Sequence, residues 1–242
     1  MPHKLSNVKA NAQASFSLGE PEKNPEMAAR ILNVMSSFGR LDGEIGLVFA
    51  RLLDTQAHLG IAIYNQLVST HLQDAALKAV APFVLEEHQL DLLMGLVDLG
   101  RGHKDIRNDI AHGIWGYSQD LPKALLLINP KTANQLRGIM ATVWERQKVA
   151  PASIATIEPV LMKTLQRPIQ EDIWVFREKD TNNLAAEVQA VYELWDSFAH
   201  YRWPNDQQSG DEAHRRLLAH STLRSTVNDR RRGREQAELP PL

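Results

Sequence analysis

The chain has 242 residues, enough for one large domain or for a core domain with appendages. Hydrophobic residues make up 43% and charged residues 23%, as is usual for a soluble globular protein. The chain has no cysteine, which excludes disulfides, thiolate zinc sites and a cysteine nucleophile. It begins without the apolar core of a signal peptide and has no apolar run long enough to span a bilayer. We therefore expect a cytoplasmic protein without membrane contact.

The formal net charge is -2, so the chain as a whole is not a basic nucleic-acid binder. The charge is uneven, because seven arginines and one aspartate lie between His214 and Arg234. We expect residues 204–242 to form a polar to basic, disordered tail. The alternative is that these arginines contact phosphates.

Residues 1–25 are polar and without periodicity, which predicts a flexible N-terminal arm. From Glu26 to Leu52 apolar residues recur at spacings of three and four, which predicts one long amphipathic helix. We expect further helices at about 56–70, 72–80 and 84–112, the last stopped by Gly113 as the residue after the cap. Four helices with short joints predict an up-and-down bundle.

The pattern changes after Trp115. Residues 124–128 and 173–177 are short apolar runs with strand character, and residues 133–147 and 184–200 have helical patterns. The expected fold is therefore mainly α, a helical bundle with a small C-terminal segment of two short strands and additional helices. The bundle should span residues 26–118, and residues 119–203 should form an accessory segment packed on it.

The candidate site is the segment from Arg107 to Gly113 near the end of the fourth helix. An arginine followed by four to six residues and a histidine occurs three times, at Arg51–His58, Arg107–His112 and Arg215–His220, so this spacing does not select a site. Of these three arginines only Arg107 is followed by an amide, and of the three histidines only His112 lies between alanine and glycine. On a helical wheel Asn108 and His112 lie about 160° from the core stripe centred near Ile110 and point outward.

The same outward helix face carries Met94 and Val97, which are apolar where solvent would favour charge. An uncovered apolar surface indicates a second packing partner, and a homodimer is the simplest one. A two-fold axis would then bring two copies of Asn108 and His112 to one polar cleft.

The run Arg107-Asn108-Asp109-Ile110-Ala111-His112 resembles the motif of the HEPN superfamily of helical-bundle domains. The resemblance covers about residues 26–118. It implies a homodimeric, metal-independent endoribonuclease that acts on RNA in a toxin–antitoxin or antiphage setting, in some cases with an antitoxin protein as partner. No metal or other cofactor is implied, since the sequence has no HExxH, GxGxxG or P-loop pattern.

The resemblance also implies roles for single residues. Arg107 would hold the phosphate and stabilise its developing charge. His112 would move the proton of a ribose 2′-OH or of the leaving 5′-oxygen, giving a 2′,3′-cyclic phosphate and a 5′-OH. Asn108 would orient His112 or the substrate. We further expect substrate contacts from Trp115, Tyr117 and Lys104, and support from Asp42, Glu44 and Asp109.

Other interpretations remain open at this point. The second interpretation is a non-catalytic HEPN-like binding module for a nucleotide, RNA or a protein. The third is a helical scaffold without a ligand. Arg107 would then pair with Asp105 or Asp109, and His112 would sit at the negative end of the helix dipole. Likewise, Asp42 and Glu44 would be ordinary surface acids, and Trp115 a hydrophobic plug over the bundle end.

Overall fold

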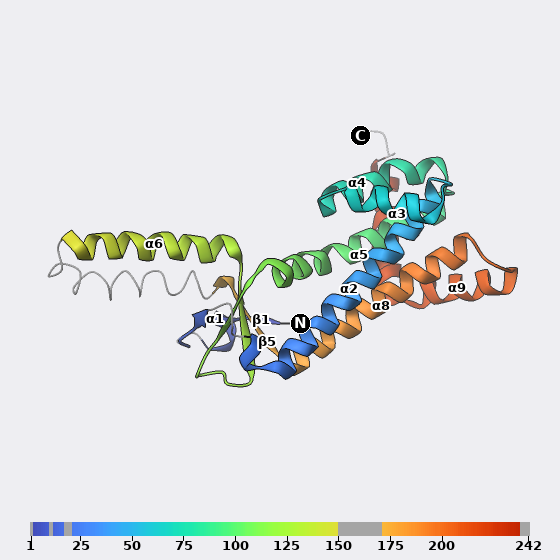
Figure 1. The fold of residues 1–242 in the computed structure, drawn as a ribbon. Helices are drawn as coiled ribbons and strands as arrows, with labels where there is room; N and C mark the ends of the chain where they lie inside the picture. Colours follow the sequence, from blue (N-terminus) through green and yellow to red (C-terminus); the bar gives the residue numbers. More distant parts are fainter. Residues whose placement is uncertain (1, 10–11, 17–20, 150–170, 238–242) are drawn as a thin grey trace. The chain divides into compact units, whose positions relative to one another are not determined.

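The computed structural model describes residues 2–9, 12–16, 21–149 and 171–237 (Figure 1). The chain forms two compact units: a sheet unit of Met1–Met35 and Arg107–Ala185, and a helical unit of Ser36–Ile106 and Ala186–Leu242. The boundaries fall inside three long helices, α2 (Pro25–Leu52), α5 (Glu87–His112) and α8 (Glu178–Arg202). The fold is mainly helical with a small antiparallel sheet, which confirms the predicted class.

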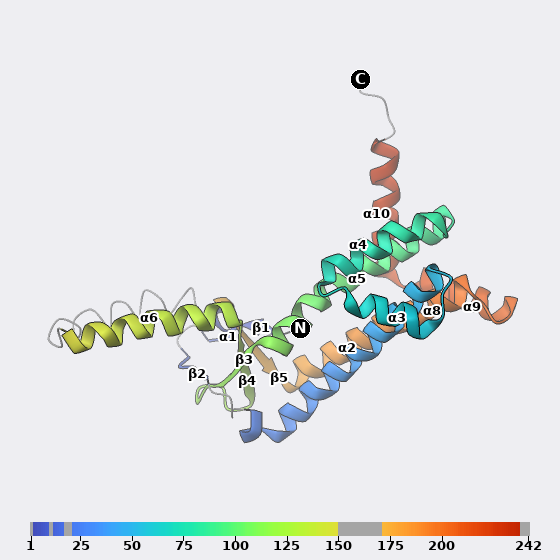
Figure 2. The same cartoon turned by 45° about the horizontal axis from the view of Figure 1, so that its top comes forward.

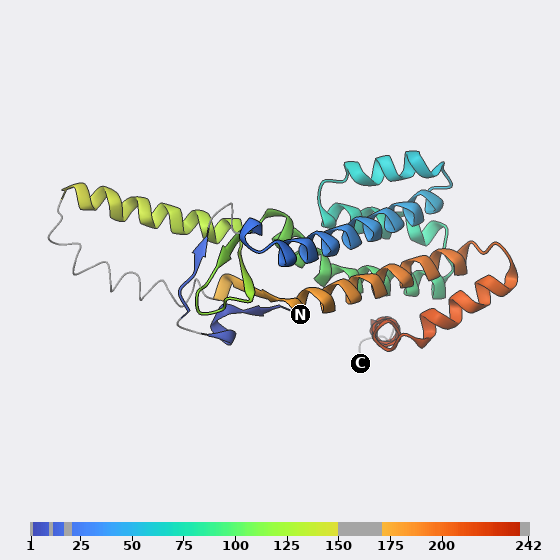
Figure 3. The same cartoon turned by 60° about the horizontal axis from the view of Figure 1, so that its bottom comes forward.

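The sheet unit is built on five antiparallel strands in the order β1-β5-β4-β3-β2. Arrows of this sheet are seen in Figure 3. The strands are β1 (His3–Lys4), β2 (Ser15–Phe16), β3 (Ile114–Tyr117), β4 (Ala124–Ile128) and β5 (Ile173–Arg177). The central strand β4 is buried along its whole length, which explains its unbroken apolar sequence. The short helices α1 (Leu5–Val8) and η1 (Pro21–Lys23) and the long helix α6 (Pro130–Val149) complete the described part of the unit.

The described residues of the N-terminal segment contribute two strands to this sheet, which corrects the prediction of a flexible arm at residues 1–25 for these residues; residues 1, 10–11 and 17–20 lie outside the described ranges. β1 pairs with β5, and β2 pairs with β3. Leu5 is completely buried in the same apolar cluster as Leu126 and Val175. Strands of two residues carry no detectable periodicity, and their partners lie far along the chain, so the sequence pattern gave no sign of them.

The helical unit contains the later part of α2, the earlier part of α5 and the later part of α8. It also contains α3 (Ala57–Gln66), α4 (Thr70–Val80), η2 (Ala81–Phe83), α9 (Gln207–Ala219) and α10 (Ser221–Ala237). Within this unit α2 and α8 run parallel, because Arg40 lies over the ring of Tyr192 and Arg51 lies over that of Trp203. The unit therefore draws its helices from both halves of the chain, and the bundle does not end at residue 118 as predicted.

The helix α5 runs antiparallel to α8 in the helical unit. His103 near the end of this part of α5 lies 3.5 Å from the carboxylate of Glu187 near the beginning of α8. His88 at the other end lies 2.5 Å from the hydroxyl of Tyr201. The connection between these helices contains the β3–β4 hairpin and α6, so their pairing joins distant stretches of sequence.

The basic tail forms two helices, α9 and α10, which corrects the prediction of disorder for residues 207–237 (Figure 2). Asp206 and Ser209 form a capping box at the start of α9. In α10 Leu223 and Val227 are buried and pack on the face of α5 that carries Gly95. This apolar stripe is sparse among the arginines, which is why composition concealed it.

Two ion pairs hold α10 to α5. The guanidinium of Arg230 binds the carboxylate of Asp98, and Arg231 Nε lies 3.0 Å from the buried Asp91. Two of the tail arginines are therefore bound to acids of the same chain. The two ion pairs orient α10 on α5, whereas the buried apolar surface of the contact comes from Leu223 and Val227.

The apolar face that suggested a homodimer is covered within the single chain. Met94 and Val97 are only 8% and 3% exposed. All positions from Asp91 to Val97 are buried, so this stretch of α5 is surrounded on every side. This face of α5 therefore leaves no uncovered apolar surface that would require a homodimer.

Replacing Leu223 by alanine tests the packing of α10. Because Leu223 is fully buried, we expect Leu223→Ala to lower the free energy of unfolding by about 2 kcal/mol or more, measured by urea denaturation. Leu218→Ala is the matched control, since Leu218 is 46% exposed and its loss should change stability by less than about 0.5 kcal/mol. Equal effects of the two substitutions would show that α10 does not pack as described.

Candidate functional site

The last turn of α5 brings the residues of the predicted motif to one end of the sheet. Arg107, Asn108 and Asp109 are half-buried, and His112 is exposed at the final position of the helix. Arg107 Nη1 donates a hydrogen bond of 3.1 Å to Asn108 Oδ1. The side chain of Asn108 therefore holds the guanidinium of Arg107, a role that we had expected it to play toward His112 or a substrate.

The imidazole of His112 is open to solvent. Within the described part of the chain it makes no hydrogen bond and no ion pair. As an exposed residue it does not pack beneath the strands that follow. This is the arrangement that a proton-transferring group needs before its substrate arrives.

Asp109 fixes this turn of α5 to the sheet. Its Oδ2 accepts a hydrogen bond of 3.0 Å from Trp174 Nε1 on β5, and its Oδ1 accepts one of 3.3 Å from Asn129 Nδ2 just after β4. Its main-chain oxygen accepts a bond of 2.7 Å from the N–H of Gly113. Since three groups converge on one residue, the helix end cannot rotate freely, and His112 leaves it in a defined direction.

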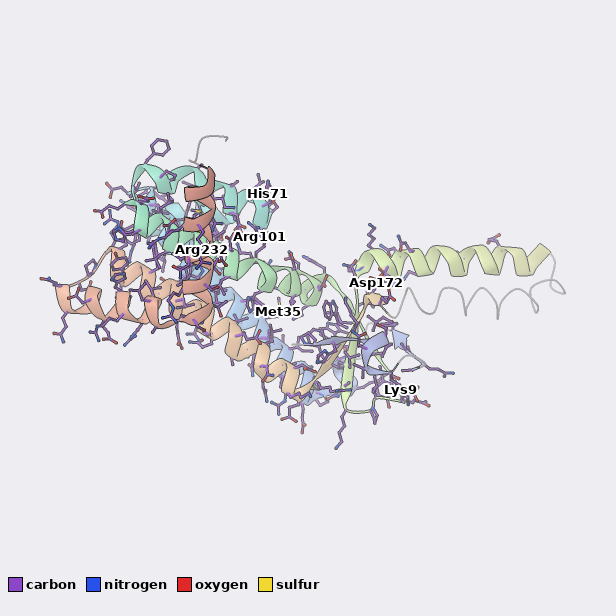
Figure 4. The ribbon with its side chains drawn as sticks, turned by 180° about the vertical axis from the view of Figure 1, so that it is seen from behind. Lys9, Met35, His71, Arg101, Asp172 and Arg232 are labelled. Atoms are coloured by element: carbon purple, nitrogen blue, oxygen red, sulfur yellow. The ribbon has the colours of Figure 1, made fainter. Side chains whose placement is uncertain are left out.

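Polar groups surround this anchor in a cavity of about 310 Å³. Lys4 Nζ lies 3.4 Å from the centre of the Trp174 ring, and burial lowers the pKa of Lys4 although Asp109 and Asp172 oppose the shift. Asp172, labelled in Figure 4, accepts a hydrogen bond of 2.9 Å from Thr132. The carboxylates of Asp109 and Asp172 already accept hydrogen bonds from donors of the chain itself. The polar groups around this cavity therefore stabilise the end of α5.

Trp115 and Tyr117 lie on β3, directly after the helix. The ring of Trp115 packs edge to face against buried Phe176, with 5.5 Å between centroids. Tyr117 pairs with Ser15 at the far end of the strand. Both residues are half-buried, and only Trp115 lies near the end of the sheet that carries His112.

Lys104 belongs to the helical unit, where its ammonium group is committed to Asp74. The two charged atoms lie 3.0 Å apart, and the residues are only 7% and 5% exposed. Removing either partner of such a buried pair lowers stability, because the other charge is left buried without a partner. We therefore assign Lys104 to the stability of the helical unit and not to substrate binding.

Asp42 and Glu44 also belong to the helical unit. Burial raises the pKa of Glu44, nearby Asp196 raises it further, and Arg51 and His200 lower it. These neighbours come from α2 and α8 of the same unit. The environment described for Glu44 thus consists of helix-surface charges, and it gives no support to a role in positioning Arg107.

The contacts that hold the site come from residues that sequence reasoning did not select. Trp174 and Asn129 bind Asp109, and Lys4 covers Trp174. These residues lie 65, 20 and 105 positions from Asp109 along the chain. An indole or amide flanking a short strand has no spacing that connects it to a helix end, so no pattern in the sequence identifies them.

Three comparisons with known proteins add no relative: no family model, no curated protein and no solved structure matches the chain. Over the ranges that the structure describes, no group of three or more histidine or acidic side chains is arranged to hold a metal ion. In the same ranges none of the helices combines the length and apolar character needed to cross a membrane.

Substituting Asp109 by asparagine tests the anchor. An amide keeps the size but offers one accepting oxygen in place of two, so a hydrogen bond to Trp174 or Asn129 is lost. We expect Asp109→Asn to reduce the free energy of unfolding by about 1–3 kcal/mol and to change the fluorescence of Trp174. The control is Asp105→Asn, on an exposed position one turn earlier. An unchanged Asp109→Asn protein would refute the anchoring role.

Gly113 is required by a close approach and not by a left-handed backbone, since its φ is not positive. A Cβ there would lie 2.5 Å from the main-chain oxygen of Asp109 and would overlap the side chain of Leu127. We expect Gly113→Ala to cost about 1–3 kcal/mol in thermal or urea unfolding. Gly100→Ala, in the same helix with open space around it, should stabilise by up to about 1 kcal/mol. Similar stabilisation at both positions would contradict this account.

Proposed function

We propose that the chain is a metal-independent endoribonuclease of the HEPN type, acting at the end of α5. The observation that carries the proposal is the exposed imidazole of His112 at the end of a helix that Asp109 binds to the sheet, with the Arg107–Asn108 pair about one turn earlier. An accessible acid–base group and a phosphate-binding group on one anchored helix end are the minimal equipment for cleaving RNA without a metal.

The chemistry proceeds by attack of the ribose on its own phosphodiester. His112 accepts the proton of the 2′-OH, and the 2′-oxygen bonds to phosphorus as the bond to the 5′-oxygen breaks. The products are a 2′,3′-cyclic phosphate and a 5′-OH, and the leaving oxygen takes up one proton. Arg107 neutralises the charge that grows on the phosphate oxygens, and its bond to Asn108 limits the entropy lost when it binds.

In this proposal a second copy of the chain supplies the proton donor that one copy lacks. One histidine cannot act as base and as acid in the same step, so the leaving oxygen needs another donor. Arg107 and His112 are also about 140° apart around the helix at about 100° per residue, and they face different sides. We therefore propose a homodimer in which both copies contribute to one cleft. The interface of this dimer does not include Met94 and Val97, which are buried within one chain.

The cellular setting rests on the resemblance of the Arg107–His112 segment to the HEPN motif. We propose a cytoplasmic toxin or antiphage effector, restrained by an antitoxin protein until RNA cleavage is required. If the chain binds RNA at this site without cleaving it, the non-catalytic binding module is the better description.

Incubation of the purified protein with total RNA in EDTA tests the activity. We expect cleavage fragments ending in 2′,3′-cyclic phosphate, identified by mass spectrometry. His112→Ala should lower the rate at least about 100-fold while unfolding as the wild type does, since the side chain is exposed. Arg107→Lys should also lose most activity, because lysine keeps the charge but not the planar fork.

His71→Ala is the matched control, an exposed histidine of the helical unit that should leave cleavage unchanged. Equal cleavage by wild type and His112→Ala would exclude this site as its source, and dependence on added metal would exclude the mechanism. Sedimentation of the same samples tests the assembly. An active species that is monomeric would contradict the shared cleft.

A further inference from the structure

A cavity of about 900 Å³ opens at the end of the sheet opposite to His112. Ile114 pairs with Ile128 at the His112 end, whereas Ala124 pairs with Arg177 at the other. Four residues of β4 separate these ends, about 13 Å at about 3.3 Å per residue. The cavity belongs wholly to the sheet unit, and its lining residues come from the start of α2, the β3–β4 connection and the junction of β5 with α8.

Two of the three acids that line the cavity are already neutralised. Glu178 receives a bond of 2.6 Å from Arg30, which also binds Asn182. Asp120 accepts bonds from Lys9 Nζ (2.7 Å) and from a main-chain N–H (3.0 Å), and these bonds lower its pKa. Lys9, labelled in Figure 4, is not itself part of the lining. Asp120 and Glu178 therefore do not repel a negatively charged ligand. Glu26 is the remaining acid of the lining.

Three cations of the lining are available. Lys123, Arg177 and Lys179 make no side-chain ion pair in the described part of the chain. Against the single remaining acid, Glu26, they leave a surplus of two positive charges, three minus one. A carboxylate ligand would match only half of this surplus. A phosphate monoester, with about -1.5 to -2 charges near neutral pH, matches all of it.

The floor of the cavity is apolar. Met27 and Ala124 are 5% and 2% exposed, and Leu121 and Pro122 lie beside them in the lining. Cations at the rim and an apolar floor favour a ligand with an anionic head and a flat, weakly polar body. The volume lies within the range of about 300–1,000 Å³ that is usual for small-molecule sites.

We propose that this cavity binds a phosphate monoester with a planar body, of the nucleoside monophosphate class. Lys123, Arg177 and Lys179 hold the phosphate, and the body lies against Met27 and its apolar neighbours. The site is separate from His112 and does not depend on ribonuclease activity. The same chemical group occurs on a free nucleotide and at the 5′ end of an RNA strand.

Calorimetric titration of the full-length protein with adenosine 5′-monophosphate and with adenosine tests this site. The monophosphate should bind at least about ten-fold more tightly than the nucleoside, because charge-assisted bonds are made only to the phosphate. Lys179→Gln and Arg177→Gln should each weaken monophosphate binding about five- to ten-fold. Glu26→Gln should tighten it, since the one opposing charge is removed.

Lys78→Gln is the matched control, an exposed lysine of the helical unit whose loss should leave the affinity unchanged. A 5′-phosphorylated 2′-O-methyl oligoadenylate, which cannot be cleaved, separates the two sources: tighter binding than the monophosphate identifies an RNA end, and weaker binding a free nucleotide. His112→Ala should bind the monophosphate as the wild type does, so that failure of the ribonuclease proposal is seen separately. Equal binding of nucleoside and monophosphate, no binding at millimolar concentration, or equal losses in Lys179→Gln and Lys78→Gln would overturn the proposal.

Discussion

The carboxylate of Asp109 connects three separate stretches of the chain. One oxygen accepts from Trp174 on β5 and the other from Asn129 after β4, so the last turn of α5 is bound to two strands at once. The orientation of His112 depends on these contacts, although His112 makes none of them. A half-buried carboxylate whose acceptors are both used is also costly to disturb, because each lost partner leaves a polar atom unsatisfied.

The sheet has the last residues of α5 at one end and a cavity lined by cations at the other. Between the two ends β4 is buried along its whole length and carries no polar side chain. At one end α5 passes into β3 within one residue, and only glycine fits at position 113 because Leu127 and the oxygen of Asp109 lie so close. At the other end the cavity is lined by the β3–β4 connection and by Arg177 and Lys179, which lie at and just after the end of β5. The two proposed sites therefore both depend on the stability of a small sheet.

The helical unit shows how little apolar surface is needed to order a charged segment. In α10 two buried residues, Leu223 and Val227, meet α5 where Gly95 leaves room for them, and arginines on the neighbouring turn bind Asp91 and Asp98. Packing supplies the stability, and the ion pairs fix the register. The same contact covers part of α5, which explains why an apolar face of that helix needs no second copy of the chain.

Local patterns in the sequence determined the long helices, the strands at Ala124–Ile128 and Ile173–Arg177, and the position of Arg107, Asn108 and His112 at a helix end. These features are recorded within a few turns or a few residues, where hydrophobic periodicity acts. Only the tertiary structure decided that residues 3–4 and 15–16 join the sheet, that Asp109 is an anchor, that Asp74 neutralises Lys104 and that Arg177 lines a cationic cavity. Each of these depends on a partner tens of residues away, and the choice of such a partner leaves no periodic trace in the sequence.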